Sequence, residues 1–129
     1  MRVLIVEPHK VPYERDIENE LHYMQDVVRG LIELVGLDEE TTMVCNEEGK
    51  LIGLEGNRRV GRDIIAGTFF ICGFNDEGEF CSLTDEQVEK YKGRFQEDEH
   101  YTVKQIEDSI FVEVYSGNVS SEIDDELEL

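Results

Sequence analysis

Two short turn segments, each preceded by an apolar run, limit the fold that this chain can adopt. Asn46-Glu47-Glu48-Gly49 follows Thr41–Cys45, and Asn75-Asp76-Glu77-Gly78 follows Thr68–Phe74. A glycine that closes such a turn takes a positive φ without the steric penalty of a Cβ atom. Both segments therefore predict hairpins and hence an antiparallel sheet. The returning strands are expected at Leu51–Leu54 and Glu79–Ser82.

The remaining pattern adds three more strands and two helices, and one of these strands is Leu31–Val35. Arg2–Val6 is a near-continuous apolar run, typical of a buried central strand, and Val11–Ile17 is typical of an edge strand. After Asn19, apolar residues recur at the three- and four-residue spacing of an amphipathic helix. Thr84-Asp85-Glu86-Gln87 is a capping box that opens a second helix. The sequence predicts an α+β fold, a mostly antiparallel sheet with both helices packed on one face.

Charge divides the chain into a body and an extension. The 129 residues contain 12 Lys and Arg against 31 Asp and Glu, a formal net charge of −19. Residues 1–95 are predicted to form one compact domain. Residues 96–129 are predicted to form an acidic C-terminal extension, with a strand at 109–115 and a disordered tail.

The same charge excludes several classes of partner. Direct binding of nucleic acid requires Lys and Arg to displace counterions from phosphates, and an anionic membrane surface makes the same demand. No apolar run approaches the roughly 18 residues of a spanning helix, and no signal peptide is visible. We therefore expect a cytoplasmic protein without direct nucleic-acid or membrane contacts.

Cysteine and histidine give no strong chemical signal. Cys72 and Cys81 would lie opposite each other in a short second hairpin, but buried free thiols are the simpler expectation for three cysteines. The three histidines are expected on the surface, and no spacing indicates zinc. No nucleophile–base arrangement is visible, so we predict no catalytic residue, no metal, no cofactor and no enzyme activity. The histidines are His9, His22 and His100.

A loop-like segment, residues 53–63, concentrates glycine and arginine. Glycines allow a close backbone approach and arginines hold anions through two hydrogen bonds, so a nucleotide or phosphate could bind here. Internal pairing of these arginines with the many carboxylates is the competing interpretation. The candidate anion-binding residues are Asn57, Arg58, Arg59 and Arg62.

Bands of carboxylates can also imitate a phosphate backbone and occupy the basic groove of a DNA-binding protein. Acidity that serves only solubility is the alternative. The candidate partner-binding acids lie in the second hairpin and in the tail. They are Asp76, Glu77, Glu79, Asp124, Asp125 and Glu126.

Five segments in a consistent order resemble the prokaryotic "domain of unknown function 3846" family over residues 1–95. These segments are Arg2–Pro8, Asn46–Leu51, Asn57-Arg58, Asp63–Ile71 and Ser82–Gln87. The glycine that usually follows Glu7-Pro8 is His9 here. The resemblance implies no established activity, and it implies products of phages, plasmids and conjugative elements, sometimes near antirestriction proteins.

Two hypotheses follow. The first is a non-enzymatic phage or mobile-element accessory protein that binds and inhibits a host defence or nucleic-acid-handling protein by acidic DNA mimicry, as an antirestriction or anti-CRISPR type inhibitor. The alternative is a protein that binds or sequesters a nucleotide or anion at residues 53–63. A structural subunit, and a homodimer formed through an exposed edge strand, also stay open.

Overall fold

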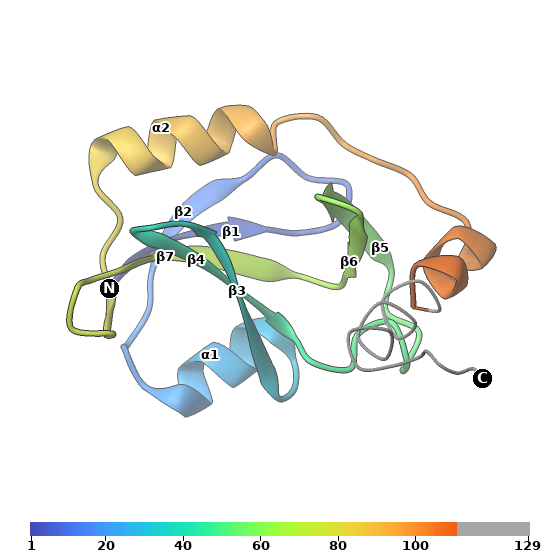
Figure 1. Ribbon diagram of the computed structural model, residues 1–129, viewed down its shortest axis with the longest axis horizontal. Coiled ribbons are helices and arrows are strands. Elements are labelled where there is room, and N and C mark those ends of the chain that lie inside the picture. Colours follow the sequence, from blue (N-terminus) through green and yellow to red (C-terminus); the bar gives the residue numbers. More distant parts are fainter. Residues whose placement is uncertain (111–129) are drawn as a thin grey trace, which may run out of the picture.

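The computed structural model describes residues 1–110, which build one six-stranded antiparallel sheet, a separate two-stranded ribbon and helices around them (Figure 1). All strand pairings in this part of the chain are antiparallel, and the larger sheet has the order β2-β1-β7-β4-β3 with β8 added to β7. The α+β class and the antiparallel sheet are therefore confirmed. The strands are β1 (Arg2–Val6), β2 (Tyr13–Asp16), β3 (Ile32–Asp38), β4 (Thr41–Asn46), β5 (Gly56–Val60), β6 (Asp63–Ala66), β7 (Phe69–Phe74) and β8 (Phe80–Cys81).

The helices α1 (Leu21–Val28) and α2 (Asp85–Arg94) pack on opposite faces of the sheet, which corrects the prediction of one shared face. Successive side chains of a strand point to opposite faces. In β1, Val3 and Ile5 join the core beneath α1, whereas Leu4 and Val6 join the core beneath α2. Because the central strands are apolar on both faces, each face needs its own cover.

Local sequence explains α2 better than α1. Thr84 accepts the backbone N–H of Gln87, whose side chain accepts the backbone N–H of Thr84, so the predicted capping box is confirmed. The N-cap of α1 is Glu20, which makes no side-chain capping bond, and the helix ends at Arg29 in the left-handed conformation. The α1 helix therefore depends on packing of Met24 and Val28 against the sheet.

The first predicted hairpin is wrong. Residues 47–53 form consecutive turns, with Ile52 N–H donating to Glu48 O and Leu54 N–H donating to Gly49 O, so no strand returns along β4. The chain instead crosses to the β5–β6 ribbon. A Cβ atom on Gly49 would lie 2.5 Å from Ala66 O, so glycine is needed there for a close backbone approach and not for a positive φ.

The second hairpin is confirmed with a shifted register. Phe74 pairs with Phe80 and Gly73 pairs with Cys81, so Cys72 does not lie opposite Cys81. The five-residue loop, with Gly78 at φ 77° and the Asn75 side chain accepting two backbone N–H groups, accounts for the shift. None of the three cysteines, which all lie within the described residues, takes part in a disulfide; Cys45 and Cys72 are buried and Cys81 is half-buried.

The start of the extension differs from its prediction. Residues 103–110 are helical, so the first two positions of the strand predicted at 109–115 belong to a helix, and the others lie outside the described residues. Thr102 and Gln105 repeat the capping-box exchange, a signal that the sequence already contained. The tail acids Asp124, Asp125 and Glu126 also lie outside the described part. The boundary at 95 and the disordered tail stay predictions.

Two general expectations concern the outside of the molecule. The outer strands of the larger sheet are β2 and β3, and pairing of either with a second copy stays a prediction. Among the helices within residues 1–110, none has the length and apolar character needed to span a bilayer.

Candidate functional site

The first candidate site, the arginine-rich segment, is in large part interior structure. Asn57 and Arg58 lie on β5 and are completely buried, with no exposed surface. The Arg58 guanidinium donates through Nε and Nη2 to Phe95 O at 3.1 and 3.0 Å, and through Nη2 to Lys10 O at 2.7 Å. Its Nη1 donates to Asn57 Oδ1 at 2.9 Å. The donors of Arg58 are thus directed at the chain itself, so this side chain is not open to an external anion.

This corrects the predicted anion site and also its competing interpretation. The partners of Arg58 are carbonyl oxygens rather than carboxylates, and one of them is the orphan carbonyl at the C-terminus of α2. Asn57 Nδ2 donates to Val6 O and Gly67 O, so this amide is equally committed. Through these hydrogen bonds, Asn57 and Arg58 hold β5 against the C-terminal end of α2 and the turn after β1.

Arg59 and Arg62 remain on the surface. The Arg59 guanidinium lies 5.5 Å from the centre of the Tyr101 ring and donates through Nη1 to Arg62 O at 3.4 Å. With Asp108 and Ser109, both arginines line a depression against the 103–110 helix. Only half of the predicted set, Arg59 and Arg62, is therefore accessible.

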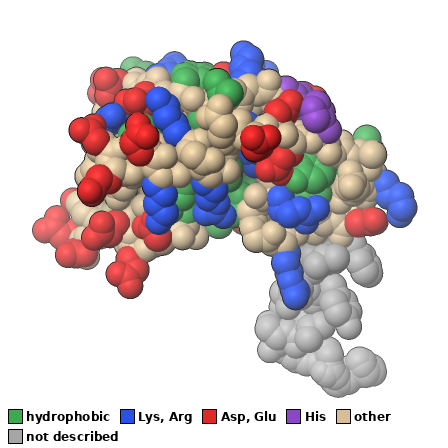
Figure 2. All heavy atoms as spheres, turned by 90° about the horizontal axis from the view of Figure 1, so that it is seen from above, with side chains coloured by type: hydrophobic (Ala, Val, Ile, Leu, Met, Phe, Trp, Pro, Cys, Tyr) green, Lys and Arg blue, Asp and Glu red, His purple; other side chains and the backbone are tan. Residues whose placement is uncertain are grey.

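A second candidate surface collects exposed carboxylates at one end of the molecule, which we call the acidic end. Three segments that are far apart in the sequence meet there: the β3–β4 turn, the β7–β8 loop and the first turns of α2 (Figure 1). Figure 2 shows acidic side chains gathered at the left, the end that these segments occupy in Figure 1. Its acids are Asp38, Glu39, Glu40, Asp76, Glu77, Glu79, Asp85, Glu86 and Glu89.

Backbone and side-chain hydrogen bonds hold the three segments together. Phe74 N–H donates to Glu40 O at 2.8 Å, which ties the β7–β8 hairpin to the β3–β4 turn. Asp38 accepts from Thr41 Oγ1 at 2.7 Å and from Tyr91 on α2, and it pairs with Lys90 at 3.3 Å. Burial alone would raise the pKa of Asp38, but these donors outweigh it and hold that pKa well below its usual range.

The predicted acids Asp76, Glu77 and Glu79 belong to this end and are exposed. The sequence did not indicate that the β3–β4 turn and α2 would add to them. That assembly depends on strand order, because β4 and β7 are neighbours and their turns therefore open at the same edge.

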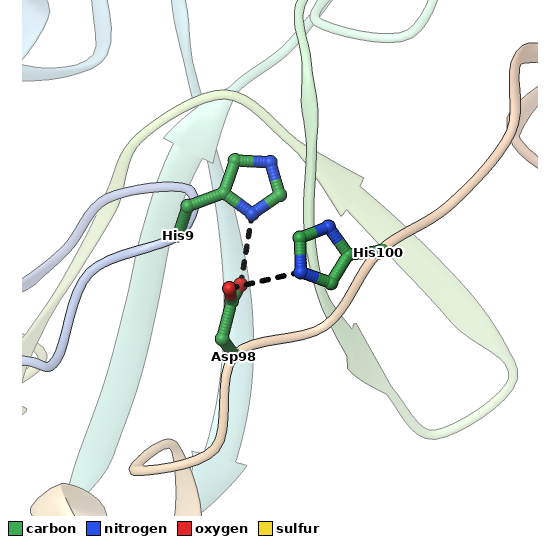
Figure 3. A group of neighbouring side chains, drawn as sticks. All are labelled: His9, Asp98 and His100. Atoms are coloured by element: carbon green, nitrogen blue, oxygen red, sulfur yellow. Dashed lines mark hydrogen bonds and ion pairs between the residues drawn. The ribbon is translucent and has the colours of Figure 1, made fainter.

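A third site was not predicted. His9, Asp98 and His100 form a cluster at the opposite end of β1 (Figure 3). His9 Nδ1 lies 2.9 Å from Asp98 Oδ1, and His100 Nε2 lies 3.0 Å from Asp98 Oδ2. The two imidazole rings stack with centroids 4.5 Å apart and planes 20° apart. A fourth group, Glu55 Oε2, lies 2.6 Å from His9 Nε2.

The chain positions this cluster from three segments. His9 occupies the turn between β1 and β2 with φ at 64°, a left-handed conformation that is uncommon for residues other than glycine. Asp98 and His100 alternate with Glu99 and Tyr101, which contact Arg59 instead. The hydrogen bonds to Asp98 and Glu55 raise the pKa of His9 above its usual value.

The family of the chain can now be stated. The model of the family described as "Domain of unknown function (DUF3846)" matches residues 1–96. The chain belongs to this family. Comparison with curated proteins and with solved structures found no match.

The matched range separates the DUF3846 domain, residues 1–96, from the segment that follows it in this chain. It covers all of the labelled strands and both labelled helices, and it confirms the resemblance expected over residues 1–95. Asp98 and His100 come after the matched residues, whereas His9 and Glu55 lie within them. One signal was available in the sequence: a histidine in a place where the family resemblance indicates glycine.

Proposed function

We propose that this DUF3846 protein is a binding protein whose acidic end docks on the basic groove of a nucleic-acid-handling protein, where it takes the place of DNA. In this proposal the partner is a host defence or element protein, and the action is inhibition of the antirestriction or anti-CRISPR type. The protein needs no catalytic group for this role.

One observation carries the proposal: the acidic end brings carboxylates from three segments together on a rigid frame. Such a surface raises the rate of encounter with a basic partner, and it sets up electrostatic complementarity. Within residues 1–110 the carboxylates of Glu39, Glu77 and Glu86 make no hydrogen bond or ion pair, and they project from the turns of the sheet and from α2. They are therefore available to lysine and arginine of a partner.

The alternative of a nucleotide- or anion-binding protein is weaker. Its two central residues, Asn57 and Arg58, are buried and bonded to the chain. A ligand would have to displace three carbonyl contacts of one guanidinium group, which leaves buried acceptors without donors. The surface pair Arg59 and Arg62 would have to act without them.

The proposal is tested with two variants of equal charge. The first replaces Glu39, Glu77 and Glu86 of the acidic end with Gln. The second replaces Glu18, Asp26 and Glu47, which are exposed elsewhere, with Gln or Asn. Each variant and the unaltered protein are immobilised, loaded with host lysate and eluted with a salt gradient.

We expect the unaltered protein and the second variant to retain a DNA-binding protein that elutes at moderate salt. We expect the first variant to lose this DNA-binding protein. We expect duplex DNA to release the same protein from the unaltered chain by competition. Equal retention by both variants would contradict docking at the acidic end. Retention that duplex DNA does not disturb would contradict mimicry of DNA.

A further inference from the structure

We propose that His9, Asp98 and His100 bind a divalent transition-metal ion of the Zn²⁺ class, with Glu55 as the carboxylate that orients His9. The site lies at the opposite end of β1 from the acidic end, so the proposal is independent of the proposed docking surface.

The three ligand atoms already converge. One ring nitrogen from each histidine and one carboxylate oxygen lie within 4.8 Å of one another. In a tetrahedral zinc site with bonds of about 2.0–2.1 Å, neighbouring ligand atoms are about 3.4 Å apart. His9 Nδ1 and His100 Nε2 contact different oxygens of Asp98, at 2.9 and 3.0 Å, and one ligand atom from each residue lies within 4.8 Å of the others. An ion held by a single Asp98 oxygen therefore requires the side chains to turn toward that oxygen.

The hydrogen bond of Glu55 is the second, independent observation. Neutral imidazole carries its proton on one nitrogen, and the partner of that nitrogen decides which one. Both nitrogens of His9 face a carboxylate, Nδ1 at 2.9 Å from Asp98 Oδ1 and Nε2 at 2.6 Å from Glu55 Oε2. When an ion displaces the proton between Nδ1 and Asp98, Glu55 holds the remaining proton on Nε2 and leaves the lone pair of Nδ1 for the ion. A histidine that donates to a carboxylate through one nitrogen and binds metal through the other is the usual arrangement around protein metal sites.

The donor set selects the class of ion. Two imidazoles and one carboxylate suit Zn²⁺ and its neighbours in the first transition row, whereas Ca²⁺ and Mg²⁺ prefer oxygen ligands throughout. Three protein ligands leave a fourth position for water or for a group from a partner. All three ligands are exposed, so an ion can enter from solvent.

Such an ion would join the segment that follows α2 to the turn that follows β1. Residues 96–102 have no regular secondary structure and lead into the 103–110 helix. Metal binding would fix this segment at Asp98 and His100 in addition to its contacts with Arg59. The ion would therefore stabilise the position of the helix relative to the body.

The experiment uses the full chain, freed of metal with a chelator that is then removed, and titrated with Zn²⁺ or Co²⁺. We expect one ion per chain, a visible Co²⁺ spectrum of imidazole coordination, and a melting temperature that rises with Zn²⁺ concentration. Glu55→Gln is expected to weaken Zn²⁺ binding by about 10–100-fold, and Asp98→Asn or His100→Ala by at least that factor.

Two variants make the test specific. His22→Ala removes the third histidine, which lies on α1 beside Glu20, and is expected to leave Zn²⁺ binding unchanged. His9→Gly removes a ligand at a position whose positive φ glycine adopts freely, so the turn after β1 is expected to keep its conformation. Absence of binding to the unaltered chain would overturn the proposal. Equal Zn²⁺ affinity in the unaltered chain and the His9 or His100 variants would overturn it too.

Discussion

Arg58 offers the sharpest test of how this fold is held together. Replacement by alanine removes a fully buried guanidinium and leaves three acceptors without their donor, namely Phe95 O, Lys10 O and Asn57 Oδ1. A buried acceptor without a partner costs about 1–3 kcal/mol. Relief of the desolvated charge offsets part of this cost, so we take about 1–1.5 kcal/mol for each acceptor.

The expected loss is about 3–5 kcal/mol of unfolding free energy, a large fraction of the 5–15 kcal/mol typical of a domain. At about 4 °C per kcal/mol, the melting temperature should fall by about 12–20 °C. The chain has no tryptophan, so urea and thermal unfolding are followed by far-UV circular dichroism. The stability of Arg58→Lys should lie between those of the unaltered protein and Arg58→Ala, because an ammonium group cannot donate in the planar geometry of a guanidinium.

Arg59→Ala is the matched control. This neighbouring arginine is exposed and contacts the Tyr101 ring, a contact worth about 0.5–1 kcal/mol. If Arg58→Ala unfolds within about 1 kcal/mol of Arg59→Ala, the structural role of Arg58 is refuted. Loss of nucleotide binding in Arg58→Ala without loss of stability would instead restore the predicted anion site.

Three further predictions concern single side chains. Asp38→Asn should lower the melting temperature at neutral pH, and the difference in melting temperature from the unaltered protein should shrink in acid. Folding lowers the pKa of Asp38, so its stabilising contribution is complete above its unfolded pKa of 3.8. That contribution is lost as the pH falls through the lowered pKa of the folded state. Melting curves between pH 7 and pH 2 check this, and a constant difference would contradict it. In the absence of metal, His9→Gly should melt at a higher temperature than His9→Ala, because only alanine keeps the strain of a positive φ. Thr84→Ala should cost about 1 kcal/mol in urea unfolding through loss of the capping box, and an unchanged midpoint would argue against that cap.

Short-range physics made much of this fold predictable. The β1 run, the helix that begins at Thr84 and the hairpin after β7 each depend on residues within a few positions of one another. The second capping box, Thr102 with Gln105, obeys the same rule, although the β-branched residues that follow it in sequence favour a strand. Composition likewise indicated a strongly acidic protein, and the absence of direct nucleic-acid binding stays a prediction from that charge.

Only the tertiary structure decided which groups meet. Residues 46–50 have the chemistry of a hairpin turn, yet the neighbours of β4 are β3 and β7, so no edge was left for a returning strand. Arg58 resembles a surface anion ligand in sequence, but β5 directs it to the end of α2. The His9 cluster joins positions 89 and 91 residues apart, and no local pattern can encode such a contact. The sequence by itself determined most of the strands, both labelled helices and the distribution of charge, because those depend on near neighbours, but it did not indicate the β5–β6 ribbon. The packing of distant segments determined which side chains are buried, which are exposed, and which converge.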